Sequence, residues 1–107
     1  MDEVQARGTR MDTILDEITA ERRTLLELGL PPKGRPMHRS DLARAAAALV
    51  LSSVEGFAEA DWPKVFWPWK QAPFPLGTPR ENLLRSAVLI VAAIRRLDRR
   101  GIEKGEA

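Results

Sequence analysis

The sequence predicts an all-α fold of three main helices joined by a crossover rich in proline and aromatic residues. Apolar residues recur at helical spacing in three segments, and capping residues or glycine and proline stand at the ends of those segments. No stretch has the pattern of a strand. A chain of 107 residues is long enough for one core, so we expect a single helical domain over residues 1–107.

The first helix is expected over residues 11–28. Thr9 is its candidate N-cap, and Gly29, followed by two prolines, ends it. Its apolar stripe holds Met11, Ile14, Leu15, Ile18 and Leu25, with Arg22 among them. Residues 1–8 are polar and end in glycine, so we expect them to be frayed, as we do residues 102–107 at the other end of the chain.

The second helix is expected over residues 41–57, after a connector that contains three prolines. Ser40 is a suitable N-cap, and Gly56 weakens the end of the helix. The apolar face of this segment is rich in alanine, which allows another helix to approach closely.

The crossover, from Asp61 to Thr78, holds all three tryptophans and four prolines. Prolines at this density exclude a long helix and a central strand. The aromatic side chains therefore form a lid over the helices, a protein-binding or self-association surface, or a platform for single-stranded bases. The candidate binding residues here are Trp62, Phe66, Trp67 and Trp69, and we expect at least one tryptophan to stay exposed.

The third helix is expected over residues 79–100, and it has the clearest start signal in the chain. Thr78 is the N-cap, Pro79 occupies the first helical position and Glu81 completes a capping box. The last turns are basic, which is favourable at the C-terminus of any helix. Arg96, Arg99 and Arg100 project away from the apolar face and are candidate contacts for nucleic acid or an acidic partner surface.

Two charged residues fall inside apolar stripes. Arg22 lies in the stripe of the first helix, and Asp98 lies in that of the third. A buried charge must be paired, so the sequence predicts an Arg22–Asp98 ion pair that sets the register of the two helices.

The composition excludes several classes of site. Without cysteine there is no disulfide, thiolate metal site or cysteine nucleophile. His38 is the only histidine, so paired-histidine metal motifs are excluded, and Ser40 is better explained as a cap than as a nucleophile. The formal net charge of +2 is low for a dedicated duplex-DNA binder. No apolar run is long enough to span a membrane, and the first twenty residues lack the apolar core of a signal peptide. We therefore expect a cytoplasmic protein that does not bind membranes.

Three motifs in the sequence carry a family resemblance. They are ITAERR at residues 18–23, WPW at residues 67–69 and the segment 80–99, which ends in RLDR. In this order they resemble the "AERRRQ" opening, the "WPW" and the closing helix of a group of small, uncharacterised phage and prophage proteins that are loosely grouped with MazG-like nucleotide pyrophosphohydrolases. The resemblance covers about two thirds of the chain, and it implies an all-α protein acting in the host cytoplasm.

The departures from this group bear on catalysis. Ala93 and Arg95 stand where the group has glutamates, and residues 25–37 lack its tryptophan and its acidic, histidine-containing loop. A helical pyrophosphohydrolase needs about four carboxylates to hold Mg²⁺. The four-residue spacing of Glu17 and Glu21, and of Glu55 and Glu59, leaves a depleted Mg²⁺ site as an alternative.

The leading hypothesis is therefore a phage-type accessory protein that acts without a cofactor, by binding another macromolecule. An inhibitor of a host defence system is a special case of this role. The alternative is a Mg²⁺-dependent, MazG-like nucleoside triphosphate pyrophosphohydrolase that uses Glu17 and Glu21.

Overall fold

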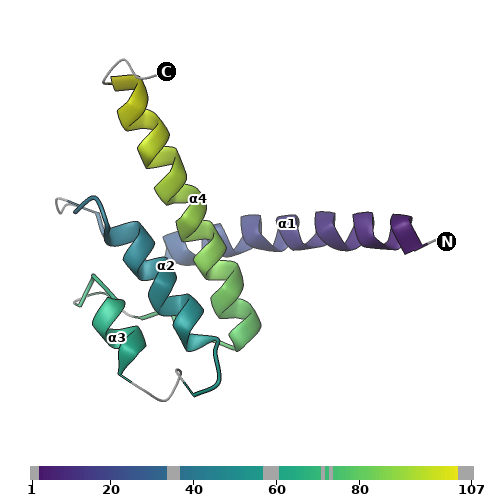
Figure 1. Cartoon of the computed structure of the whole chain (residues 1–107), viewed down its shortest axis with the longest axis horizontal. Coiled ribbons are helices and arrows are strands. Elements are labelled where there is room, and N and C mark those ends of the chain that lie inside the picture. The colour runs from purple at the N-terminus through teal and green to yellow at the C-terminus, as the bar shows by residue number, and fades with distance from the viewer. Residues whose placement is uncertain (1–2, 34–36, 57–60, 71, 73, 104–107) are drawn as a thin grey trace.

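The computed structural model describes residues 3–33, 37–56, 61–70, 72 and 74–103. They form four helices: α1 (Glu3–Glu27), α2 (Asp41–Ser52), α3 (Trp62–Phe66) and α4 (Pro79–Glu103). No strand occurs in these ranges, so the predicted all-α fold with three main helices is confirmed. Figure 1 shows α2 beside α4, the short α3 on the side of α2, and α1 crossing α4.

The helix boundaries differ from the expected ones in physically understandable ways. α1 begins at Glu3 and runs through Gly8 and the expected cap Thr9, because one glycine costs only about 1 kcal/mol inside a helix. α2 stops at Ser52, five residues early, and the turn after it contains Gly56 with a φ of 91°. α4 continues to Glu103, while residues 1–2 and 104–107 lie outside the described part of the chain.

The end of α1 forms as expected at Gly29, which has a φ of 78°. The Gly29 N–H donates to the Leu26 carbonyl oxygen at 3.0 Å, and the Leu30 N–H donates to that of Leu25 at 2.9 Å. This is the Schellman arrangement, which favours glycine because a side chain is strained at that φ. The motif also turns Leu30 into the core, where its side chain is buried.

The predicted capping box at the start of α4 is present. The Glu81 N–H donates to Thr78 Oγ1 at 3.1 Å, and the Thr78 N–H donates to Glu81 Oε1 at 2.9 Å. Next to it, the Gly77 N–H donates to Oδ1 of the buried Asn82 at 2.9 Å. These three bonds fix the point at which the crossover enters α4.

The core lies between α2, α4 and the end of α1. α2 supplies most of it, through Leu42, Ala45, Ala46, Ala48 and Leu49. Leu89 of α4 and Leu25 of α1 complete it, together with Leu30 and two tryptophans of the crossover. Because alanines line so much of α2, α4 can pack closely against it.

The crossover forms a lid over the helices, which was one of the three roles considered for its aromatic side chains. Trp67 and Trp69 are buried with their rings edge to face, 5.2 Å between centroids, and the ring of Phe74 lies 4.9 Å from that of Trp67. The indole N–H of Trp67 donates to the Trp69 carbonyl oxygen at 2.9 Å, so its buried polar group is satisfied. The five-residue α3, which begins at Trp62, was not expected from the sequence.

Candidate binding site at the end of α4

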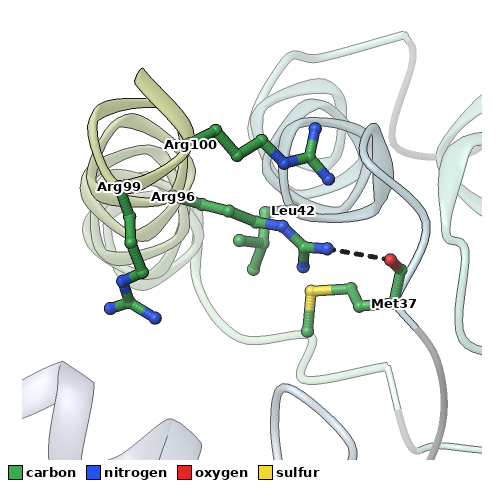
Figure 2. Close-up of a pocket in the computed structure, with 5 residues that line it drawn as sticks. All are labelled: Met37, Leu42, Arg96, Arg99 and Arg100. Carbon is green, nitrogen blue, oxygen red and sulfur yellow. Dashed lines mark hydrogen bonds between the residues drawn. The ribbon is translucent and has the colours of Figure 1, made fainter. Parts of the chain in front are cut away.

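The last turns of α4 and the start of α2 enclose a hollow of about 380 Å³. Its walls are the side chains of Met37, Leu42, Arg96, Arg99 and Arg100. Figure 2 shows Arg96 and Arg100 extending from α4 toward α2 and Met37, and Arg99 bordering the hollow from its own side of α4. All three arginines proposed from the sequence therefore line one hollow.

Arg96 is held in place by the backbone. Its Nη2 donates to the Met37 carbonyl oxygen at 3.0 Å, and its side chain is half-buried. The guanidinium groups of Arg99 and Arg100 have neither a hydrogen bond nor a salt bridge to any residue that the structure describes. The hollow thus has one oriented guanidinium and two that keep their donors for another group.

The hollow is electrostatically uncompensated. None of the residues that line it carries a carboxylate. Guanidinium groups do not lose their charge in proteins, so a carboxylate bound among them would lower their mutual repulsion. The preference of helix C-termini for cations explains a basic last turn, but it does not explain why Arg96 is bonded across the hollow to Met37.

The aromatic candidates divide into two groups. Trp67 and Trp69 are only 5% and 7% exposed. They belong to the core, so the expectation that they are binding residues is wrong, and they form part of the lid. Trp62 and Phe66 remain 55% and 36% exposed on α3. The expectation that at least one tryptophan stays exposed is confirmed.

The structure does not bring Arg22 and Asp98 together. Both side chains are exposed, and no salt bridge joins them. The ion pairs that do join α1 to α4 connect residues 63 or 64 positions apart, a register that places Arg22 beside the middle of α4. Arg22 instead borders a groove shared with Arg95, and Asp98 does not line that groove.

The pairs that set this register use different residues. Arg80 donates to both carboxylate oxygens of Glu17, at 2.8 and 2.6 Å. Arg85 donates from Nε to Glu21 at 3.0 Å and from Nη1 to the Pro75 carbonyl oxygen at 2.7 Å. The Arg85 side chain is only 12% exposed, and it ties α1, the crossover and α4 together.

Arg80 and Arg85 were not expected from the sequence as partners of Glu17 and Glu21. A signal was present, because each helix carries two charges near one edge of its apolar stripe, acidic on α1 and basic on α4. The relative register of the two helices was needed to match them.

The arrangement does not fit the alternative Mg²⁺ site. The hydrogen bonds from Arg80 hold the pKa of Glu17 below its ordinary value, and Glu21 is bonded to Arg85. Mg²⁺ would have to replace arginine at both carboxylates. In the described part of the chain no group of three or more His, Cys, Asp or Glu side chains is placed to hold a metal ion, and Glu59 lies outside it.

His38 and Ser40 are close neighbours before α2. The Ser40 hydroxyl lies 2.9 Å from His38 Nδ1, and the Ser40 N–H donates to the same nitrogen at 3.2 Å. The expected Ser40 cap is therefore not formed by its side chain. Instead Asp41 accepts the His38 N–H at 2.9 Å, and the contact between His38 and Ser40 is part of this local turn.

The chain matches no protein-family model, no curated protein and no solved structure at a significant level. None of the described helices combines the length and apolar character required to cross a bilayer.

Proposed function

We propose that this protein acts by binding an acidic segment of another protein at the arginine-lined hollow. The observation that carries the proposal is a hollow lined by three arginines and no carboxylate, with Arg96 and Arg100 extending across it toward α2 and Met37 (Figure 2). Arginine is well suited to this task because its planar fork bonds both oxygens of a carboxylate.

Two features favour an acidic protein over nucleic acid. Met37 and Leu42 add apolar surface to the hollow, which suits a carboxylate flanked by apolar side chains. The formal net charge of only +2 also provides little of the long-range attraction on which nucleic-acid binding depends.

The exposed side of α3 is a second contact in this proposal. Arg44, near the start of α2, donates to the Val65 carbonyl oxygen at 3.3 Å and so places α3 beside the beginning of α2. Leu42 enters the hollow from the same turn of α2. Leu42 and Arg44 lie on opposite sides of that turn, so a partner that extends from the hollow across the start of α2 reaches Trp62 and Phe66. Exposed tryptophan is a frequent source of binding energy.

The biological setting of the proposal rests on the phage-type motifs in the sequence. Residues 67–69 (WPW) and 96–99 (RLDR) favour a phage accessory protein, which makes a host protein the natural partner and inhibition of a host defence system one form of the role.

A binding titration tests the proposal. The probe is a fluorescent peptide of alternating glutamate and leucine, and its anisotropy is followed at physiological ionic strength beside a single-stranded oligonucleotide of equal charge. We expect the peptide to bind more tightly than the oligonucleotide. The double variant Arg99→Ala/Arg100→Ala should weaken peptide binding by about tenfold or more.

The matched control for charge is Arg95→Ala, since Arg95 lies at the same end of α4 but lines a different groove. The control should bind the peptide nearly as well as the unmodified protein. Tighter binding of the oligonucleotide, or equal weakening by Arg95→Ala, would contradict the proposal.

A further inference from the structure

α4 carries a second apolar stripe about a quarter turn from its buried side. Leu83, Ile90, Ile94 and Leu97 are 49%, 44%, 51% and 64% exposed. With Ala87 between the first two, the spacings along the stripe are 4, 3, 4 and 3 residues. This alternation is typical of helices that pair along a seam. The buried side of the same helix holds Asn82, Ser86 and Leu89. The fold of one chain therefore leaves the large residues of the stripe about half exposed, and Ile90 borders a groove toward α2.

The chain also exposes more surface than a compact monomer of its mass. Its accessible surface is 7824 Å², whereas a monomer of 12.0 kDa is expected to expose about 6,000 Å². Its radius of gyration is 15.7 Å, against about 13 Å for a compact chain of this length. Covering this excess of about 1,800 Å² on each of two chains would bury about 3,600 Å² in total, which is within the range of about 2,000–5,000 Å² for obligate homodimers.

We propose that the stripe on α4, formed by Leu83, Ala87, Ile90, Ile94 and Leu97, is the interface with a second copy of this chain. A symmetric dimer requires one self-complementary patch, and a single exposed helix face meets this requirement. The proposal is independent of the binding role of the arginine-lined hollow.

The two α4 helices run antiparallel in this dimer. A parallel pair would place Ala87 against Ala87 and leave a gap. In the antiparallel pair Ile90 packs against Ile94 of the second copy, and the small Ala87 packs against its large Leu97.

The dimer leaves the hollow open. At 100° per residue, Arg96 and Arg99 lie on the side of α4 roughly opposite the stripe, and Arg100 lies about a quarter turn from it. Arg96 also points toward Met37 and α2 rather than toward the stripe (Figure 2). Each copy therefore keeps its own hollow, and the dimer presents two of them.

The oligomeric state tests the interface. Light scattering coupled to gel filtration should give twice the 12.0 kDa of one chain. Ile94→Glu places a charge in the seam at a position that is already half-exposed, so it should give a folded monomer. The matched control is Leu15→Glu on α1, which is 54% exposed and should remain a dimer.

Circular dichroism of each variant checks that it is folded. A monomeric unmodified protein would overturn the proposal, as would a dimer that persists in Ile94→Glu. Loss of the dimer in Leu15→Glu would place the interface on α1 and would also overturn it.

The direction of the helices is tested by crosslinking, which the absence of native cysteine makes simple. Ala87→Cys and Leu97→Cys are prepared separately and oxidised alone or mixed. The antiparallel pair predicts efficient disulfide formation only in the mixture. Crosslinking of Leu97→Cys with itself, without a gain on mixing, would establish a parallel pair and overturn the arrangement.

Discussion

The two ends of α4 use the same residue type for different purposes. Near the start of the helix, Arg80 and Arg85 are bonded to carboxylates of α1, and Arg85 is nearly buried. Near its end, Arg96 bonds only to a backbone carbonyl oxygen, and Arg99 and Arg100 have no partner in the described part of the chain. The first group holds the fold together, and the second keeps its donors available to a ligand.

The difference follows from what packs against each part of the helix. α1 crosses the first half of α4 and supplies Glu17 and Glu21, whereas the last turns extend beyond it (Figure 1). A guanidinium group therefore has a structural role where another helix supplies a carboxylate. Where it borders a hollow without one, it is a candidate for binding.

The largest effect on stability is expected from Arg85→Ala. The side chain of Glu21 is only 17% exposed, and the change leaves it without its cation. The change also removes the hydrogen bond to the Pro75 carbonyl oxygen. The loss should be about 3 kcal/mol in the free energy of unfolding, measured by urea denaturation. Arg99→Ala is the matched control. Equal losses in the two variants would remove the distinction between the two ends of α4.

A smaller loss is expected from Thr78→Ala. The change removes the hydroxyl that accepts the Glu81 N–H and should cost about 1 kcal/mol in the free energy of unfolding. Thr19→Ala is the control, because Thr19 bonds only to the Leu15 carbonyl oxygen within α1, a contact that contributes little to helix stability. A neutral Thr78→Ala would show that the capping box does not anchor α4.

Acid should weaken the anchored end of α4 through Glu17 and Glu81. Hydrogen bonds from Arg80 lower the pKa of Glu17, and the backbone and hydroxyl of Thr78 lower that of Glu81. A carboxylate with a lowered pKa in the folded state stabilises that state above its ordinary pKa, which is about 4.3 for glutamate. This contribution is lost as the pH falls from there through the lower folded value.

Melting temperature measured against pH checks this expectation. Arg80→Ala should flatten the acid-side decline, because it removes the principal cause of the lowered pKa of Glu17. An unchanged decline in that variant would assign the acid sensitivity to other carboxylates.

The smallest effect on stability is expected from Arg99→Ala and Arg100→Ala. Neither side chain bonds to a described residue, so each change should alter the free energy of unfolding by less than about 0.5 kcal/mol. Urea denaturation measures this too. A loss comparable to that of Arg85→Ala would mean that these arginines are part of the fold.

Local signals in the sequence were sufficient to predict the three main helices. Thr78, Pro79 and Glu81 marked the start of α4, and Gly29 marked the end of α1, because caps and glycine turns depend on residues a few positions apart. The start of α1 at Glu3 was not predicted, because Gly8 and the candidate cap Thr9 favour a later start and the helix nevertheless runs through both.

The contacts between helices were not predictable in the same way. Arg22 and Asp98 were paired from their apolar stripes, but the choice of partner depends on the register in which α1 crosses α4, and that register pairs Glu17 and Glu21 with other arginines. Likewise, the sequence could not separate the buried Trp67 from the exposed Trp62, because the path of the crossover decides which tryptophan reaches the core. The three arginines of the hollow were found from sequence, but Met37 and Leu42 were not.

The proposed division of α4 into an anchoring and a binding end is tested by amide chemical shifts. The uniformly ¹⁵N-labelled protein is titrated with the glutamate–leucine peptide, and its amide shifts are followed residue by residue. We expect the largest shift changes at the amides of Met37, Leu42, Arg96, Arg99 and Arg100, and unchanged amide shifts at Arg80 and Arg85. Changes centred on Arg80 and Arg85, or no changes at the hollow, would contradict it.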